Sequence, residues 1–409
     1  MISIKAGTVR DLKYFEQNVN DRYGTSAAPS DLRELLPEHS AQIRLRWARV
    51  SRGNVEIFTD GSPLAEAVQS SIGDGENVFI PVHPLEENRW PSDTLVESGT
   101  ISVSASYRTV FFEPEEDGLL SGCVSGRNAI MLKLHLERPL PGIDGDRRLT
   151  RDKIEKCVEL SSVLRDQVNM DPLGQQCEIV PEFLGLSHSR SGVLFRQIPI
   201  SEVLPLFSLF SIDTGNPTAP TYIEQWLRGQ YGENSREAAR EFGCQLARPL
   251  LRSLFAGFRA GFSMEMHAQN VLVRPGRDSL IDRVYFRDLE GVVFSSRFRA
   301  ERGLEPLFEN LDNEEIDDNR VSMTRWFNRN VDHDLGRVFS GALRALTSSG
   351  YFDERCQKVA VQTVRDTLRE CVKDAELQSL NWPGRLLPVS RSPYGNGLSK
   401  GHYYSTRYR

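Results

Sequence analysis

The chain has 409 residues, of which 39% are hydrophobic and 26% charged, a composition typical of a folded globular protein with a sizeable core. A formal net charge of −6 argues against a general nucleic-acid-binding protein. No apolar run approaches the roughly 18 residues of a membrane span, and the N-terminal stretch MISIKAGTVRDLKYF lacks the apolar core of a signal peptide. Six scattered cysteines without a CxxC pair favour a cytoplasmic protein with free thiols.

The first half of the chain predicts mostly β-structure. Short apolar or alternating runs predict strands over residues 41–50, 55–59, 77–84, 100–112, 128–136 and 191–200. Two helices interrupt these strands, one near residues 63–71 and a longer one over about 151–169. This half, about residues 1–205, is therefore predicted to be rich in β-sheet.

After Pro220 the pattern changes to helices. Helical stretches are predicted over residues 221–230, 235–262, 335–346 and 361–372, where apolar side chains recur at i, i+3 and i+4. The tail from Ser390 is rich in Gly, Ser, Tyr and Arg without periodicity and is predicted to be disordered. We therefore expect an α+β fold, with a β-rich half followed by a mainly helical half that contains one β-hairpin.

The hairpin is EMHAQNVLVRPGRDSLIDRVYFRDLEG, residues 265–291, whose VLV and VYF runs predict two strands. If the first strand is extended through this motif, Glu265, His267 and Gln269 share one face. The loop PGRDSLID joins antiparallel strands and sets Gln269 and Asn270 roughly opposite Asp288 and Arg287. Acids, amides, a histidine and an arginine are thus predicted to meet in one patch.

Two interpretations of this polar patch remain open. The side chains can form a salt-bridge cluster that satisfies itself. Alternatively, because one arginine cannot neutralise all the acids and hard oxygen ligands suit Mg²⁺, Glu265 and Asp288 are metal ligands with Asn270 assisting.

A second group of polar residues lies in SASYRTVFF, residues 104–112. Ser106, Arg108 and Thr109 offer two hydroxyls and a planar guanidinium, which suit phosphate oxygens. Downstream cations are Lys133 in MLKLHL and the pair Arg147–Arg148. Purely structural roles are equally open for these cations, with Lys133 as a strand residue and the two arginines as loop charges. Upstream, His83 in IPVHP is equally open as a core histidine.

Taken in order, six segments resemble the NRPS-independent siderophore synthetases of the aerobactin-synthetase (IucA/IucC) type. They are PVHP (81–84), SYRT (106–109), LKL (132–134), FRQIP (195–199), EMHAQN (265–270) and FRDLEG (286–291). The resemblance spans about residues 35–380 and implies a cupped hand of thumb, fingers and palm. The implied regions are a remnant of the thumb and start of the fingers in 1–75, ATP-binding fingers in 76–205, a palm with the carboxylate and magnesium site in 206–389, and a flexible tail in 390–409.

The resemblance implies an ATP-dependent ligase of siderophore biosynthesis. Such an enzyme adenylates a carboxylate of citrate or a related polycarboxylic acid, releases pyrophosphate, and condenses the adenylate with an amine or alcohol. The implied cofactors are ATP and Mg²⁺, and the implied partners are the small-molecule substrates and a second copy of the chain, with no nucleic acid and no membrane.

The residue roles follow from the same resemblance. The residues expected to hold ATP phosphates are Ser106, Arg108, Thr109 and Lys133. Those expected to bind the carboxylate substrate are Arg148 (or alternatively Arg147), His267, Gln269 and Asn270. Glu265 and Asp288 are expected to position Mg²⁺. Arg108, Lys133 and His267 are the expected catalytic residues, acting by placement and charge stabilisation.

This sequence departs from the family pattern at several positions. Asp144 stands where the family has a Thr, Leu85–Glu86 replaces an aromatic–Gln pair, and Arg196–Gln197 replaces Arg–Glu. Nothing in residues 1–34 resembles the family's GHPxHPxxK motif, which contacts ATP, so we expect a chain that lacks the thumb and the start of the fingers and is impaired in catalysis. Two other functions stay open: a small-molecule phosphotransferase with a kinase-like H-x-x-N core, and a truncated, non-catalytic family member.

Overall fold

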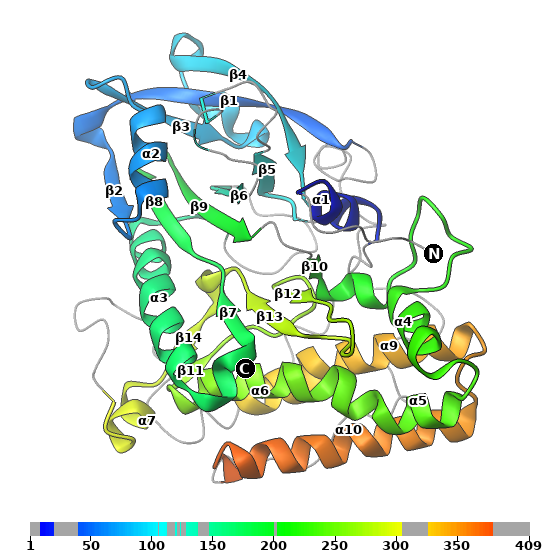
Figure 1. The fold of residues 1–409 in the computed structure, drawn as a ribbon. Coiled ribbons are helices and arrows are strands. Elements are labelled where there is room, and N and C mark those ends of the chain that lie inside the picture. Colours follow the sequence, from blue (N-terminus) through cyan, green and yellow to red (C-terminus); the bar gives the residue numbers. More distant parts are fainter. Residues whose placement is uncertain are drawn as a thin grey trace.

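The structure is a computed structural model that describes residues 9–19, 40–104, 106–112, 119–120, 123, 128–137, 147–199, 203–304 and 326–378. Asp144, most of residues 1–34 and the tail from Ser390 lie outside these described residues. Within them the fold is α+β, as predicted, with one large and one smaller sheet and a layer of helices (Figure 1). The four regions expected from the sequence stay predictions.

The larger sheet has eight antiparallel strands in the order β2-β8-β9-β6-β5-β4-β1-β3. Its strands are β1 (Gln42–Ser51), β2 (Glu56–Thr59), β3 (Asn77–Val82), β4 (Leu95–Val103), β5 (Thr109–Phe112), β6 (Asn128–Leu134), β8 (Glu182–His188) and β9 (Ser191–Pro199). The strand predicted over residues 100–112 is two strands, because the SYRT segment forms a turn between β4 and β5. Helix α2 (Pro63–Ser71) forms where it was predicted.

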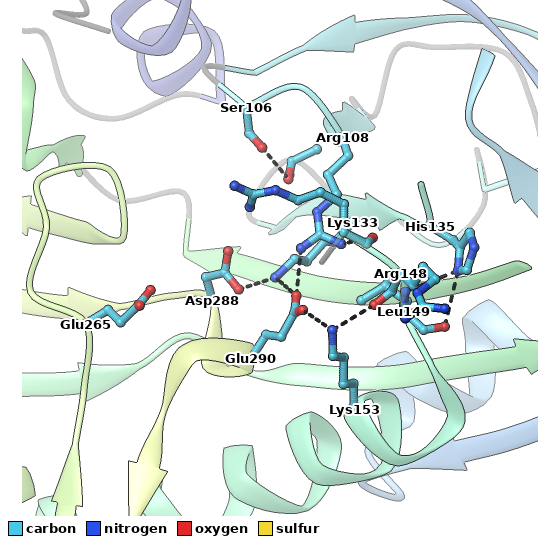
Figure 2. A network of polar contacts seen from close by, with 12 residues as sticks. Ser106, Arg108, Lys133, His135, Arg148, Leu149, Lys153, Glu265, Asp288 and Glu290 are labelled. Carbon is cyan, nitrogen blue, oxygen red and sulfur yellow. Dashed lines mark hydrogen bonds and ion pairs between the residues drawn. The ribbon is translucent and has the colours of Figure 1, made fainter. Parts of the chain in front are cut away.

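Helix α3 (Arg151–Met170) packs closely on the large sheet. Thr150 caps its first turn by accepting a hydrogen bond from the amide of Lys153, at 3.4 Å. At Gly185 of β8, a Cβ atom would lie only 2.2 Å from Cγ2 of Ile154, so only glycine allows this approach. The close packing brings the N-terminal end of α3 towards the polar cluster described below (Figure 2).

The predicted hairpin is present in the smaller sheet, of order β10-β12-β13-β7. Its strands are β7 (Cys177–Ile179), β10 (Leu204–Pro205), β12 (Val271–Arg274) and β13 (Arg283–Phe286). Strands β12 and β13 pair antiparallel with Val271 opposite Phe286, as the loop PGRDSLID predicted. The parallel pairing of β13 with β7 was not predicted, because it joins segments far apart in the sequence. A two-stranded sheet, β11 (Phe262–Ser263) and β14 (Val293–Phe294), pairs the segments that precede and follow the hairpin in the chain.

The helical half contains α4 (Tyr222–Tyr231), α5 (Ser235–Phe242), α6 (Arg248–Arg259), α7 (Ser296–Glu301), α9 (Gly336–Ser348) and α10 (Glu354–Asp374). The single helix predicted over 235–262 is wrong, because a π-helical stretch, Gly243–Ala247, separates α5 from α6. Pro249 has no amide hydrogen to continue a regular ladder there. None of the described helices combines the length and apolar character needed to cross a bilayer.

An unpredicted helix, α1 (Val9–Asn18), covers the junction of the two sheets (Figure 1). Its Leu12 is buried in a cluster with Phe111 and Met131 of the large sheet and Leu272 and Tyr285 of the hairpin. The hairpin therefore packs against the large sheet along a seam that α1 closes.

The packing of α3 predicts a large effect from one methyl group. We expect Gly185→Ala to lower the free energy of unfolding by about 1–3 kcal/mol, because the added Cβ must displace Ile154. The control is Gly229→Ala in α4, where a Cβ would meet nothing within 4 Å, and where a helical alanine adds up to about 1 kcal/mol. Urea denaturation measures both, and equal changes would contradict the close packing.

Candidate functional site

The polar cluster forms where strand β6 meets the loop that follows β13 (Figure 2). Lys133 lies on β6 opposite Thr109 of β5, and its side chain is 3% exposed. Its ammonium pairs with the carboxylate of Asp288 and lies 2.8 Å from Oε2 of Glu290. Both acids come from the FRDLEG segment, so the large sheet supplies the cation and the loop after the hairpin strand β13 supplies the anions.

Three further cations surround these two acids. Nη2 of Arg108 lies 2.7 Å from Oε2 of Glu290, and Nζ of Lys153 on α3 lies 3.2 Å from Oε1 of the same carboxylate (Figure 2). Nη2 of Arg196 on β9 lies 3.7 Å from Oδ1 of Asp288. The FRQIP segment thus contributes its arginine to the cluster.

Arg196 is itself held by a deeper acid. Its Nε donates to Oε1 of the fully buried Glu182 at 3.1 Å, and its Nη2 pairs with the same oxygen. The sequence-based prediction gave no role to Glu182, Glu290 or Lys153. Four cations therefore face three carboxylates, and this excess of positive charge favours a bound anion.

The pKa values within the cluster are shifted toward the charged forms. Burial alone would raise the pKa of Asp288, but Lys133 and Arg196 lower it far below its ordinary value. Burial opposes ionisation of Glu290 as well, yet Lys133 and Arg108 lower its pKa to about 2. Burial would lower the pKa of Lys133, and the two acids outweigh it and raise that pKa. All these groups are therefore charged at neutral pH.

The loop that carries the acids has an unusual backbone. Asp288 is left-handed, with φ 72° and ψ 74°, and among the described residues other than glycine only Glu376 shares a positive φ. Such a conformation costs on the order of 1–3 kcal/mol and is typical of functional loops. At Gly291 a Cβ atom would lie 2.5 Å from the carboxyl carbon of Glu265. The final glycine of FRDLEG thus lets Glu265 approach this loop.

The EMHAQN segment does not form the extended strand that was predicted. Strand β12 begins only at Val271, and His267–Asn270 form a turn in which the amide of Asn270 donates to the carbonyl of His267 at 2.9 Å. The reason is tertiary: the amide of Met266 donates to Oδ1 of Asn330 at 3.1 Å instead of to a neighbouring strand. The shared face predicted for Glu265, His267 and Gln269 is therefore wrong.

The turn nevertheless gathers polar groups around Glu265. Its Oε2 accepts from Nδ2 of Asn270 at 3.2 Å and lies 3.8 Å from Nε2 of His267. Nη2 of Arg329 lies 3.4 Å from Oε1, and this arginine begins a π-helical stretch, Arg329–Leu335. Arg329 was missed in the sequence because no local pattern connects it with the hairpin.

The side chain of Arg287 pairs with neither Asp288 nor Glu290 in the described contacts. Its amide donates to the carbonyl of Asn270 at 2.9 Å, which confirms the predicted opposition of these two residues. Its guanidinium donates to the carbonyl of Gln269, from Nε at 2.9 Å and from Nη2 at 2.7 Å, and pairs with Glu16. The cations of the large sheet, rather than Arg287, therefore neutralise Asp288.

The SYRT turn is held by hydrogen bonds on both sides. Oγ1 of Thr109 donates to Oγ of Ser106 at 3.3 Å. The buried His83 donates from Nε2 to the carbonyl of Tyr107 at 3.0 Å and accepts from the amide of Leu85 at Nδ1, 3.2 Å. Burial lowers the pKa of His83, so its ring is neutral and holds the turn that presents Arg108.

The two neighbouring arginines lie in different surroundings. Burial and the nearby Arg108 lower the pKa of Arg147, and the attraction of the site acids Glu290, Asp288 and Glu265 offsets this only in part. The Arg147 carbonyl also accepts a hydrogen bond from Arg108. Arg148 has a half-exposed side chain, and its Nη1 lies 3.9 Å from Oε1 of Glu137.

Comparison with known proteins places this fold. The sequence matches no protein-family model and no curated protein. Among solved structures, it is similar to ATP-bound aerobactin synthetase IucA from a hypervirulent pathotype of Klebsiella pneumoniae, with a TM-score of 0.63 and 16% identity over 85% of this chain and 66% of that one. The chain has the fold of these siderophore synthetases.

Two further synthetases are similar in the same way. Aerobactin synthetase IucC from the same pathotype has a TM-score of 0.60 and 16% identity over 86% of this chain and 67% of that one. Petrobactin biosynthesis protein AsbB from Bacillus anthracis str. Sterne has a TM-score of 0.57 and 15% identity over 88% of this chain and 66% of that one. This chain spans about two thirds of the length of these synthetases.

The ion-pair cluster predicts a strong effect on stability. We expect Lys133→Met to lower the free energy of unfolding by about 3–5 kcal/mol, because two carboxylates lose their shared buried cation. The matched control is Lys358→Met, which removes an exposed pair with Glu354 at 2.8 Å and should change the stability little, because water screens that pair. Both are measured by urea denaturation at neutral pH. Similar small losses in the two variants would show that the cluster does not depend on Lys133.

Proposed function

We propose that this protein is an ATP-dependent ligase of the NRPS-independent siderophore synthetase family. It adenylates a carboxylate of citrate or a related polycarboxylic acid and joins the acyl group to an amine or alcohol. The observation that carries this proposal is the cluster in which Arg108 and Lys133 meet Asp288 and Glu290. The fold of siderophore synthetases, one of them solved with ATP bound, supports it.

The electrostatics of the proposed reaction explain the need for such a cluster. A triphosphate and a polycarboxylate repel each other when they are brought together, by about 4 kcal/mol for each pair of unit charges 4 Å apart at an effective dielectric constant of 20. Fixed cations remove this repulsion without reorganising during the reaction. The cations of the SYRT turn, β6, β9 and α3 are already held in place by acids, so they are preorganised for an anion.

The proposed reaction has two steps. An oxygen of the substrate carboxylate forms a bond to the α-phosphorus of ATP, and the bond to the pyrophosphate oxygen breaks. The nitrogen or oxygen of the second substrate then attacks the acyl carbon, loses its proton and displaces AMP. The chain contributes orientation and charge stabilisation to both steps.

We assign the nucleotide phosphates to Ser106, Arg108, Thr109 and Lys133. Their common turn and strand pair support this assignment, since the turn presents two hydroxyls and a guanidinium beside the ammonium of Lys133. We assign the carboxylate substrate to the other side of the acids, where His267, Gln269 and Asn270 form their turn. Arg147 fits this role better than Arg148, because Arg147 lies among the site charges.

The residues fit Mg²⁺ as an ion shared with the nucleotide. Among the described residues no group of three or more His, Cys, Asp or Glu side chains is arranged to hold a metal alone. Mg²⁺ is commonly held by one or two carboxylates together with substrate phosphates, and Glu265 and Asp288 are two hard oxygen donors near one loop. They would hold the ion, which when bound neutralises phosphate charge.

The nucleotide product tests the proposed function. With ATP, Mg²⁺, a panel of di- and tricarboxylates and hydroxylamine as the acceptor, we expect acid-dependent release of AMP and pyrophosphate. Reactions without acid serve as the control. Release of ADP with a phosphorylated acceptor would replace this proposal by a phosphotransferase. If no acid supports nucleotide turnover, the result favours the alternative of a non-catalytic protein.

The two neighbouring arginines provide a matched test of the substrate pocket. Arg147→Ala should raise the KM for the acid about 10- to 150-fold, the loss of one charge-assisted contact worth about 1.5–3 kcal/mol. Arg148→Ala removes the same side chain from a half-exposed position and should change that KM less than about twofold. Steady-state kinetics at saturating ATP measures both. A larger effect at Arg148 would reverse the assignment.

A further inference from the structure

Helix α1 is joined to the hairpin by a buried ion pair. Arg287 pairs through Nη2 with Oε1 of Glu16, and the two side chains are 5% and 1% exposed. The same guanidinium donates two hydrogen bonds to the carbonyl of Gln269, at 2.9 and 2.7 Å. Arg287 therefore connects α1 with the turn His267–Asn270.

Helix α1 is also fixed to both halves of the fold. Nε2 of Gln17 donates to the carbonyls of Ala41 and Val103, each at 3.0 Å, so α1 holds the end of β4 just before the SYRT turn. On the palm side, the hydroxyl of Tyr14 donates to the carboxylate of Asp213 at 2.8 Å. Glu16 thus projects from a helix that has polar anchors outside the hairpin, in addition to the packing of Leu12 against it.

We propose that Glu16 is a positioning residue of the active site, acting through Arg287 on the turn that binds the carboxylate substrate. This inference rests on the proposed function for the identity of the ligand. Glu16 holds the guanidinium in the one orientation that satisfies the Gln269 carbonyl. Without a carboxylate at position 16, a buried cation loses its partner and turns toward other acceptors or water, and the turn loses two charge-assisted hydrogen bonds.

The effect is specific to the acid side of the site. Asp288 follows Arg287 in the chain, but Lys133 and Arg196 hold its side chain independently of α1. Arg108 lies against Glu290 and the Arg147 carbonyl, away from Glu16. A change at Glu16 therefore disturbs the turn His267–Asn270 and leaves the phosphate-facing cations in place.

The experiment compares Glu16→Gln with Tyr14→Phe in the full chain. Both variants remove one polar anchor of α1, but only Glu16→Gln affects Arg287. For Glu16→Gln we expect the KM for the acid to rise at least tenfold, the Kd for ATP by calorimetry to change less than twofold, and amide hydrogen exchange in residues 264–271 to accelerate at least tenfold. Tyr14→Phe should leave all three values within twofold of the wild type.

Three outcomes would contradict a positioning role for Glu16. Equal effects of the two variants, or unchanged exchange in residues 264–271, would reduce Glu16 to a structural anchor and overturn the proposal. Faster exchange with an unchanged KM for the acid would also overturn it. If the wild type forms no AMP with any acid, the proposed function fails, while the exchange comparison still decides whether Glu16 positions the turn.

A second variant keeps the proposal testable if Glu16→Gln does not fold. The double change Glu16→Leu with Arg287→Met replaces the ion pair by apolar side chains, a replacement that buried pairs often tolerate. If this variant folds and loses protection in residues 264–271, the turn depends on the ion pair as proposed. If protection is retained, the ion pair serves only to dock α1 and the proposal is wrong.

Discussion

The interaction on which the site depends is the buried ammonium of Lys133 between two carboxylates. A charge that is 3% exposed is stable only with close partners, and here both partners come from a loop 155 or more residues later in the chain. Strand β6 and the loop after β13 must therefore meet in one register. The electrostatic requirement of a single side chain thus fixes the large sheet relative to the hairpin.

That requirement also shapes the chemistry available to the site. Acids hold Arg108, Lys133, Lys153 and Arg196 in place, so their positions are set before any ligand arrives. The same acids compete with an incoming anion for these cations. A ligand that carries several negative charges together with a divalent cation overcomes this competition, because it offers the cations more charge and the carboxylates a new partner. Nucleoside triphosphates have this combination.

Local patterns were sufficient to predict the hairpin and most strands of the large sheet, but not β8. Alternation and turn residues specify β12 and β13, and Thr109 of SYRT pairs with Lys133 of LKL on adjacent strands. Contacts between segments far apart in the chain could not be predicted from these local patterns. The amide of Met266 bonds to Asn330, which breaks the expected strand at EMHAQN, and Glu16 reaches Arg287 from a helix that no periodicity indicated. Charged partners at such separations leave no local signal.

The sequence posed a choice between a cluster that satisfies itself and a site for an external charge. The observed geometry is compatible with both interpretations at once. Each carboxylate of the loop has a cation within 3 Å, so the described groups satisfy one another, yet the cations outnumber the acids and Asp288 keeps a strained, left-handed backbone. A purely structural cluster would have no reason to retain that strain or the excess positive charge. In the ligand-free protein the acids pair with most of this positive charge and keep it buried in fixed positions, which is consistent with a role in binding anions.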